Sequence, residues 1–318
     1  MRMRLFLIKG ICFAAPLLVV LGYFEIELRK VPTSYSIKRA QLAGALDRVE
    51  VLVEGPSHTE QGVFPRLLRR PAYSLAFGGQ DLYYDSALVE RHLDGARRLR
   101  VVIITVSYIS FEYRMADAIE PWRTHFYSIF FHIPNESLRL GSSLDDKSLL
   151  VFYGPEKALE YARKHFAVDL SGGDLDADGS RHVRGALGAG SAERNGQLRF
   201  EQDRSDIMHA AHFEENRAVL EELIARLQAR GVTPVLITLP VLPSYGRRAK
   251  LTPSWQRMQD AVAALSRRYG VRYFNYFDDA RFGVSDFANS DHLNESGAVK
   301  LTNIIDGDII GPLYIERR

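Results

Sequence analysis

The sequence predicts an α/β fold: a doubly wound parallel sheet of five strands between helical layers, with a cap insertion and an N-terminal transmembrane helix. Three observations support this prediction: five short β-branched runs, helical patterns between most of them, and one long apolar run at the N-terminus. Strands and helices that alternate along a chain form parallel sheets with right-handed connections. The 318 residues are enough for one large domain with an insertion.

Five short runs have the continuous apolar character of strands that are buried on both faces of a sheet. They cover residues 49–53, 72–77, 100–106, 233–239 and 271–276. The expected arrangement is flavodoxin-like. Because the carboxyl ends of parallel strands meet at one edge of the sheet, the segments that follow these runs are expected to share one rim.

Helical patterns separate most of these runs. They cover residues 86–99, 207–230, 254–269 and 295–309. Gly231 and Gly270 follow two of them directly, where a glycine commonly ends a helix. The segment 111–206 does not fit the repeat, and we interpret it as a cap inserted over the rim. Its aromatic cluster, within 122–133, is expected to form the core of the cap, with a substrate groove or a membrane or partner contact as the alternative.

Residues 1–30 are predicted to form a signal anchor and a juxtamembrane segment. Arg2 and Arg4 precede an apolar run that only Lys9 interrupts, and its length matches the roughly 20 residues that cross a bilayer. No small-residue cleavage site follows the run, which favours an uncleaved anchor over a removed signal peptide. A buried amphipathic helix is the alternative. Residues 31–318 are then expected to form the α/β domain of a single-pass protein of the bacterial inner membrane, facing the periplasm or exterior.

Composition excludes several classes of protein. With 46% hydrophobic residues, 25% charged residues and a net charge of +2, the chain is typical of globular proteins, and no nucleic-acid partner is expected. The single cysteine, Cys12, excludes an intrachain disulfide. The nine histidines lack the spacing of a His-Glu-x-x-His site, so neither a metal nor another cofactor is expected.

A serine and a histidine at opposite ends of the chain are the candidate catalytic pair. Ser57 lies in the segment 54–58 (EGPSH), directly after the first predicted strand, and His292 lies in the segment 289–294 (NSDHLN), just before the final helix. A serine hydroxyl needs a base within hydrogen-bond reach to become a nucleophile. Alone, Ser57 could be a helix N-cap and His292 a structural histidine. Their joint position at one predicted rim favours catalysis.

An attacking serine also needs donors that stabilise the oxyanion. The candidates for these donors, or for substrate-binding groups, are Gly78, Gly79, Gln80, Ser107 and His58. The two glycines allow a backbone amide to approach closely, because no side chain blocks the path. The glutamine and the serine could add side-chain donors. The histidine next to the nucleophile could contact the oxyanion or the substrate, or could simply pack or be solvated.

These segments resemble the motif blocks of the SGNH (GDSL-like) hydrolases. The sequence at 55–58 resembles the nucleophile block, the glycine pair resembles the oxyanion block, and the segment of His292 resembles the last block, in which an acid lies three residues before the histidine. The likeness covers about residues 48–312, without most of the insertion. More narrowly, the segments 239–241 and 291–298, behind a membrane anchor, resemble the DltD-like branch that is associated with polysaccharide O-acylation.

The resemblance implies a membrane-anchored serine esterase or O-acyltransferase that acts on a cell-envelope polysaccharide or related polymer through an acyl-serine. It also implies a membrane-bound O-acyltransferase as a partner. The alternative is a catalytically weak or inactive subunit that binds the glycan for such a system.

Three positions depart from the family pattern. Pro56 replaces the usual aspartate before the nucleophile, and the segment 105–108 replaces the third block. Asn289 stands where the family has the acid. An asparagine can accept a hydrogen bond from the imidazole Nδ1 but cannot stabilise the imidazolium as a carboxylate does. Asp291 and Asp286 are the alternatives; Asp291 ranks behind Asn289 because a side chain adjacent to the histidine normally points elsewhere. A Ser-His dyad is also consistent with the sequence.

Overall fold

The computed structural model describes residues 2–135, 144–154, 156, 175–206 and 210–315. The chain divides into two compact units, Met1–Ile37 with Trp122–Gly173, and Lys38–Pro121 with Asp174–Arg318. The expected insertion at 111–206 is therefore shared between the units. Parts of it, 136–143, 155 and 157–174, lie outside the described residues.

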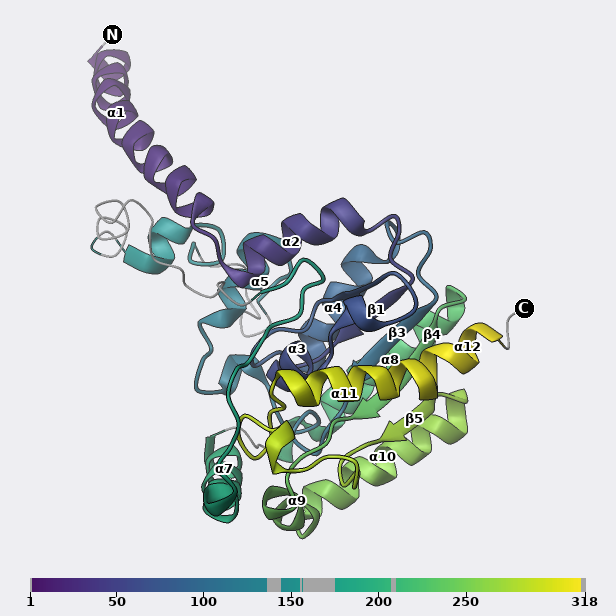
Figure 1. The fold of residues 1–318 in the computed structure, drawn as a ribbon. Coiled ribbons are helices and arrows are strands. Elements are labelled where there is room, and N and C mark those ends of the chain that lie inside the picture. The colour runs from purple at the N-terminus through teal and green to yellow at the C-terminus, as the bar shows by residue number, and fades with distance from the viewer. Residues whose placement is uncertain (1, 136–143, 155, 157–174, 207–209, 316–318) are drawn as a thin grey trace. The chain divides into compact units, whose positions relative to one another are not determined.

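The second unit is built on a sheet of five parallel strands in the order β2-β1-β3-β4-β5 (Figure 1). The strands are β1 (Val51–Glu54), β2 (Ala72–Ser74), β3 (Val101–Thr105), β4 (Thr233–Thr238) and β5 (Arg272–Asn275). Four of them lie within the predicted apolar runs, and β1 extends one residue beyond its run, to Glu54, so the predicted doubly wound sheet is confirmed. The order reverses beside β1, and in open sheets of this kind the carboxyl ends of the strands next to such a reversal are where ligands bind.

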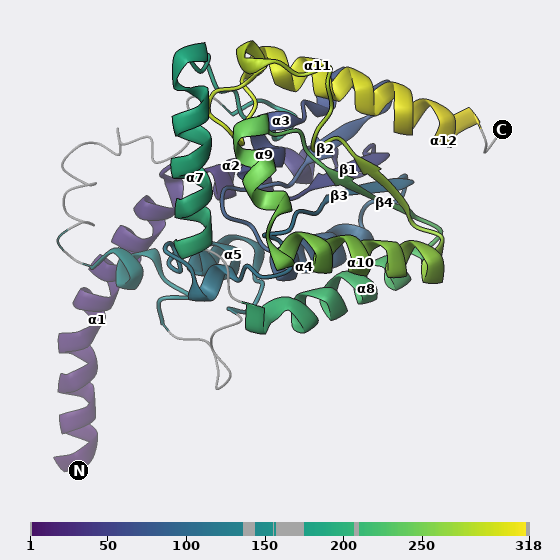
Figure 2. The ribbon, with the colours of Figure 1, turned by 90° about the horizontal axis from the view of Figure 1, so that it is seen from below.

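Helices cover both faces of the sheet (Figure 2). One face carries α4 (Leu82–Leu93), α8 (Phe213–Ala229) and α10 (Pro253–Tyr269), and the other carries α11 (Glu295–Ile305) and α12 (Gly311–Ile315). Shorter helices follow two of the strands: α3 (Ser57–Gly62) after β1 and α9 (Pro243–Lys250) after β4. The same unit also contains α7 (Ala192–Asp206).

Two helices differ from their predicted bounds for local reasons. The helix predicted at 86–99 begins earlier because the side chain of Asp81 accepts a hydrogen bond from the amide of Tyr84 at 3.0 Å and caps α4. The final helix ends at Ile305 and continues as a π-helical turn over Asp306–Ile310. The predicted stop of α10 is confirmed, because Gly270 adopts the left-handed conformation with φ of 63°.

The core on the α11 face is built by alternation along the strands. Side chains two residues apart in a strand point to the same face. The strand residues packed with α11, the π-helical turn and α12 are Val51, Val53, Val101, Ile103, Val235 and Ile237. Burial of each such aliphatic side chain contributes about 1.5–3 kcal/mol, so this layer holds the α11 end of the chain, including the segment just before it, on the sheet.

The first unit contains α1 (Arg2–Lys30) and α5 (Arg123–Phe131), and the unit boundary falls within α2 (Ser34–Ala45). Residues 3–30 of α1 form a helix that is long and apolar enough to cross a membrane. A signal sequence can have the same length and composition. Phe126 and Phe130 of α5 are buried, and Phe126 stacks on Tyr35 with ring centroids 5.1 Å apart. These aromatic residues therefore form a core of this unit.

Candidate active site

The turn after β1 presents Ser57 at the first position of α3. Gly55 has φ of 145°, and a Cβ atom there would lie 2.3 Å from Thr59 Oγ1 and 2.8 Å from Thr105 Cβ. Only glycine fits this close approach of strand, helix and turn. Pro56 takes the N-cap position without a side-chain cap, so the N-cap role considered for Ser57 is not the one that the structure gives it.

The loop before α11 brings His292 to this serine. Ser57 Oγ lies 2.8 Å from His292 Nε2 although 235 positions separate the residues. The loop is closed by the Oδ1 atom of Asn289, which accepts hydrogen bonds from the amide of His292 at 2.8 Å and from the amide of Asp291 at 3.1 Å. The two candidates that the sequence placed at one rim are thus in direct contact.

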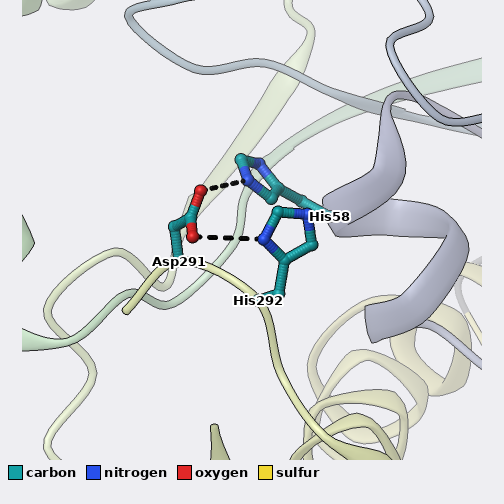
Figure 3. Close-up of side chains that lie close together, drawn as sticks. All are labelled: His58, Asp291 and His292. Atoms are coloured by element: carbon teal, nitrogen blue, oxygen red, sulfur yellow. Dashed lines mark hydrogen bonds and ion pairs between the residues drawn. The ribbon is translucent and has the colours of Figure 1, made fainter. Parts of the chain in front are cut away.

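The carboxylate that lies next to His292 belongs to Asp291 (Figure 3). Asp291 Oδ1 lies 3.1 Å from His292 Nδ1. The contact is within ion-pair distance, but neither atom forms an aligned hydrogen bond with any described group. Asn289 was expected to accept a hydrogen bond from the imidazole, but its amide oxygen accepts from the loop backbone instead. Asp286, the other alternative, forms an ion pair with Lys300.

A second histidine shares this carboxylate. His58 Nε2 lies 3.0 Å from Asp291 Oδ2, and the rings of His58 and His292 meet edge to face with centroids 4.3 Å apart (Figure 3). A carboxylate can only accept, so Nε2 of His58 and Nδ1 of His292 carry the hydrogens that face it. The Nε2 lone pair of His292 is then free to accept the proton of Ser57, which is the tautomer that a general base needs.

Charges around this cluster are set by burial and by one another. Burial alone would raise the pKa of Asp291, but the charge of His292 and the hydrogen bond and charge of His58 outweigh it and hold this pKa well below its usual range. Burial, with the charge of His292 as a smaller cause, lowers the pKa of His58. At neutral pH the site therefore holds an ionised carboxylate beside a neutral His58.

Arg199 of α7 reaches the same carboxylate, and Asp203 of the same helix contacts Arg199. Neither residue belongs to a motif that the sequence indicates. Arg199 Nε donates to Asp291 Oδ2 at 2.9 Å, and Arg199 also lies 3.3 Å from Asp203 one helical turn later. Asp203 accepts from the hydroxyl of Tyr245 at 2.7 Å, which in turn lies 2.7 Å from that of Tyr108. The only pattern that could have indicated them is the four-residue spacing of this arginine and aspartate on a helix.

A cavity of about 220 Å³ opens beside Ser57. It is lined by residues that follow three neighbouring strands and by α7, among them Ser57, His58, Gly79, Gln80, Ser107 and Arg199. Most of the predicted donors and binding residues thus border one space next to the serine. Gly78 is not among the lining residues.

The possible oxyanion donors differ in availability. The side-chain nitrogen of Gln80, Nε2, donates to Asp85 Oδ1 at 2.5 Å, to Leu75 O at 3.2 Å and to Glu54 Oε2 at 3.3 Å. Both hydrogens of this amide group therefore have protein partners. The backbone amide of Ser107 donates to Ser110 Oγ at 3.0 Å. Gly79, with φ of 68°, lines the cavity, so its backbone amide remains a candidate donor.

Buried acids lie beneath the nucleophile turn. Burial raises the pKa of Glu54 well above its usual range and raises that of Asp85 to about 8. Both side chains bind Gln80, which links β1 to α4 and the loop after β2. At neutral pH Asp85 is therefore mostly protonated, and burial favours the neutral form of Glu54 as well.

His58, Asp291 and His292 are also the only group of three that could hold a metal ion among the described residues, with ligand atoms within 4.8 Å of one another. The permanent positive charge of Arg199 on Asp291 Oδ2 opposes a second cation there. His292 Nε2 is engaged by Ser57. The donor set fits a proton-transfer site better than a metal centre.

Comparison with known proteins gives limited guidance. No family model matches the chain, and no curated protein matches it. Among solved structures, it is similar to a candidate acylhydrolase from Bacteroides fragilis, with a TM-score of 0.42 and 10% identity over 86% of this chain and 95% of that one. It is also similar to a GDSL-like lipase from Bacteroides thetaiotaomicron, with a TM-score of 0.40 and 9% identity over 89% and 100%. Similarities this distant carry no argument about the chemistry, which rests on the site itself.

Proposed function

We propose that the protein is a serine esterase or O-acyltransferase of the SGNH (GDSL-like) type. The observation that carries the proposal is the 2.8 Å contact between Ser57 Oγ and His292 Nε2 at the mouth of a cavity. The imidazole of His292 has the serine at one nitrogen and a carboxylate at the other. This is the arrangement that activates a serine for acyl transfer.

The reaction takes place in two halves. Ser57 Oγ attacks the carbonyl carbon of an ester while His292 Nε2 takes the hydroxyl proton, and the amide of Gly79 stabilises the oxyanion. The tetrahedral intermediate collapses to an acyl-serine, and His292 returns the proton to the leaving alcohol. Water or a sugar hydroxyl then attacks the acyl-serine, with His292 as base again, and Ser57 is released. Asp291 stabilises the imidazolium in both halves.

The other end of the chain supports our proposal for the location and the substrate. The apolar helix α1 can span a membrane by length and composition. Together with the likeness to the DltD-like branch, it supports an enzyme anchored in the bacterial inner membrane that faces the periplasm or exterior. The proposed substrate is an acylated cell-envelope polysaccharide or related polymer, and a membrane-bound O-acyltransferase is the proposed partner.

A second candidate is a catalytically weak subunit that binds a glycan for such a partner. The contact between Asp291 and His292 is not aligned as a hydrogen bond, and the amide of Gln80 is already used. Both observations favour lower catalytic power than a complete triad would give.

A serine-directed fluorophosphonate separates the two candidates. We expect stoichiometric labelling of the full chain in detergent, loss of labelling and of ester hydrolysis in Ser57→Ala, and retention of both in Ser205→Ala, an exposed serine of α7. Absence of labelling in the wild-type chain under conditions where it is folded would exclude the catalytic proposal and favour the binding subunit.

A further inference from the structure

We propose that Arg199 of α7 is a positioning residue, which turns the carboxylate of Asp291 toward His292 and keeps it available as the acid of the site. This inference rests on the proposed serine chemistry. Arg199 acts on Asp291 and not on the reacting atoms, so its effect on catalysis is indirect. It gives α7, a helix outside the segments that the sequence analysis identified as catalytic, a defined part in the active site.

The geometry divides the two oxygens of Asp291 between different partners. Oδ2 faces Arg199 Nε at 2.9 Å and His58 Nε2 at 3.0 Å, and this leaves Oδ1 for His292 Nδ1 at 3.1 Å. A side chain next to a histidine in sequence has no intrinsic tendency to face its ring. Two donors on other elements, α7 and α3, fix the orientation that the local backbone does not supply.

Charge gives Arg199 a role that His58 cannot fill. The side chain of Asp291 is fully buried, and a buried carboxylate without a compensating charge tends to become protonated. The other described titratable groups around it are His58 on α3, His292 on its own loop, Asp203 on α7, Tyr245 on α9 and Tyr108 after β3. None of these is permanently cationic, whereas a guanidinium is charged at every physiological pH.

The helix that carries Arg199 is fixed to the catalytic loop and to α9. Asn195 Oδ1 accepts from the amide of Ser290, in the same loop as Asp291, at 2.9 Å. Ser244 Oγ donates to Ala192 O at 2.9 Å, and Gly196 lies so close that an added Cβ would be 2.3 Å from Ser244 Oγ. The acid Asp203 holds the far side of the guanidinium. Arg199 therefore has little freedom to leave the carboxylate.

Arg199 also lines the cavity, so a substrate-binding role has to be separated from a positioning role. The test compares Arg199→Gln and Arg199→Lys with a matched control, Arg247→Gln. Arg247 also joins α7 to α9, through an ion pair with Glu193 at 2.8 Å, but it is 61% exposed and lies outside the cavity. Hydrolysis of p-nitrophenyl acetate by the full chain in detergent gives kcat, KM and their pH dependence.

We expect Arg199→Gln to lower kcat by about 10- to 100-fold, by analogy with the loss seen when groups that orient metal ligands are removed, while KM changes little. The acidic limb of its pH–activity profile should move to higher pH than in the wild type, because Asp291 without the arginine takes up a proton more readily. Arg199→Lys should recover part of kcat, and Arg247→Gln should resemble the wild type. A rise in KM alone would overturn the proposal in favour of substrate binding.

A second readout does not depend on activity. The titration of the Asp291 carboxyl, followed by carbon-13 NMR in the Ser57→Ala background and assigned with Asp291→Asn, should move to higher pH in Arg199→Gln and stay in place in Arg247→Gln. If the wild-type chain neither labels with fluorophosphonate nor turns over esters, the proposed function fails, and this titration still decides the role of Arg199. An unchanged titration in Arg199→Gln would refute it.

Discussion

Ser57 and Asp291 approach opposite nitrogens of His292, but the two sides of the ring are built differently. On the nucleophile side, a glycine, a proline and one helical turn place Ser57 within a few residues of the end of β1. On the acid side, Asp291 is held by His58 from 233 positions away and by Arg199 from 92 positions away. The nucleophile is fixed by local backbone geometry, and the acid is fixed by tertiary packing. Substitutions on the two sides should therefore fail in different ways.

The largest expected effect is on the acid side. Asp291→Asn should lower kcat by about 10³- to 10⁴-fold without unfolding the chain, because an amide neither stabilises the imidazolium nor fixes the productive tautomer. Asn289→Asp should leave kcat close to that of the wild type, because its oxygen still accepts from the same two backbone amides. Steady-state hydrolysis of a p-nitrophenyl ester measures both. Equal losses in the two variants would mean that the loop, and not the carboxylate, matters.

On the nucleophile side, the expected failure is one of folding. Gly55→Ala should destabilise the chain by about 3 kcal/mol, because a Cβ there meets Thr59 and Thr105 and φ is positive. Gly231→Ala is the matched control: its φ is 72° but no atom lies within 4 Å of the added Cβ, so a loss of about 1 kcal/mol is expected. Denaturant unfolding followed by circular dichroism measures the difference. Similar losses in both variants would show that the crowding at the turn is unimportant.

A further effect should be a pH dependence of stability from the acid beneath the nucleophile turn. Burial raises the pKa of Asp85 to about 8, whereas an aspartate in an unfolded chain titrates near 3.9, at about the model-peptide value. Between these values the folded chain holds a proton that the unfolded chain has lost, so this group makes the fold less stable as pH rises.

Asp85→Asn should remove that loss. The melting temperature of this variant minus that of the wild type should be larger at pH 8 than at pH 5. The same difference for Asp47→Asn, at an exposed residue, should not change with pH. Calorimetry of the full chain in detergent at the two pH values gives both differences. If the difference for Asp85→Asn is the same at pH 5 and pH 8, this acid is not protonated in the folded state.

The same contrast explains how much could be predicted from the sequence. The five strands were predicted because continuous apolar runs are a local pattern, and the segment of Ser57 was found because a glycine turn after a strand is local too. The start of α4 differs from the prediction because Asp81 caps the helix. The acid side was predicted least well: the resemblance to the family pattern favoured Asn289, and only the folded loop shows that its oxygen caps the backbone.

Arg199 could not be predicted from its surroundings in the sequence. It lies on a strongly polar helix in which most charges look solvated, and its contact with Asp291 depends on how closely α7 approaches α9 at Gly196. Such a contact is set by packing between segments that are distant in the chain. Residues that complete a site in this way require a structure to identify them.

The central claim is that Ser57 forms an acyl intermediate with His292 as its base. The most direct test is rapid mixing of the full chain with p-nitrophenyl acetate, followed by acid quench and peptide mass analysis. The account predicts a burst of nitrophenol no larger than the protein concentration and an acetyl group on the peptide that contains Ser57, both absent in Ser57→Ala. Ester turnover by the wild type that persists in Ser57→Ala, with no acetylated peptide, would contradict it.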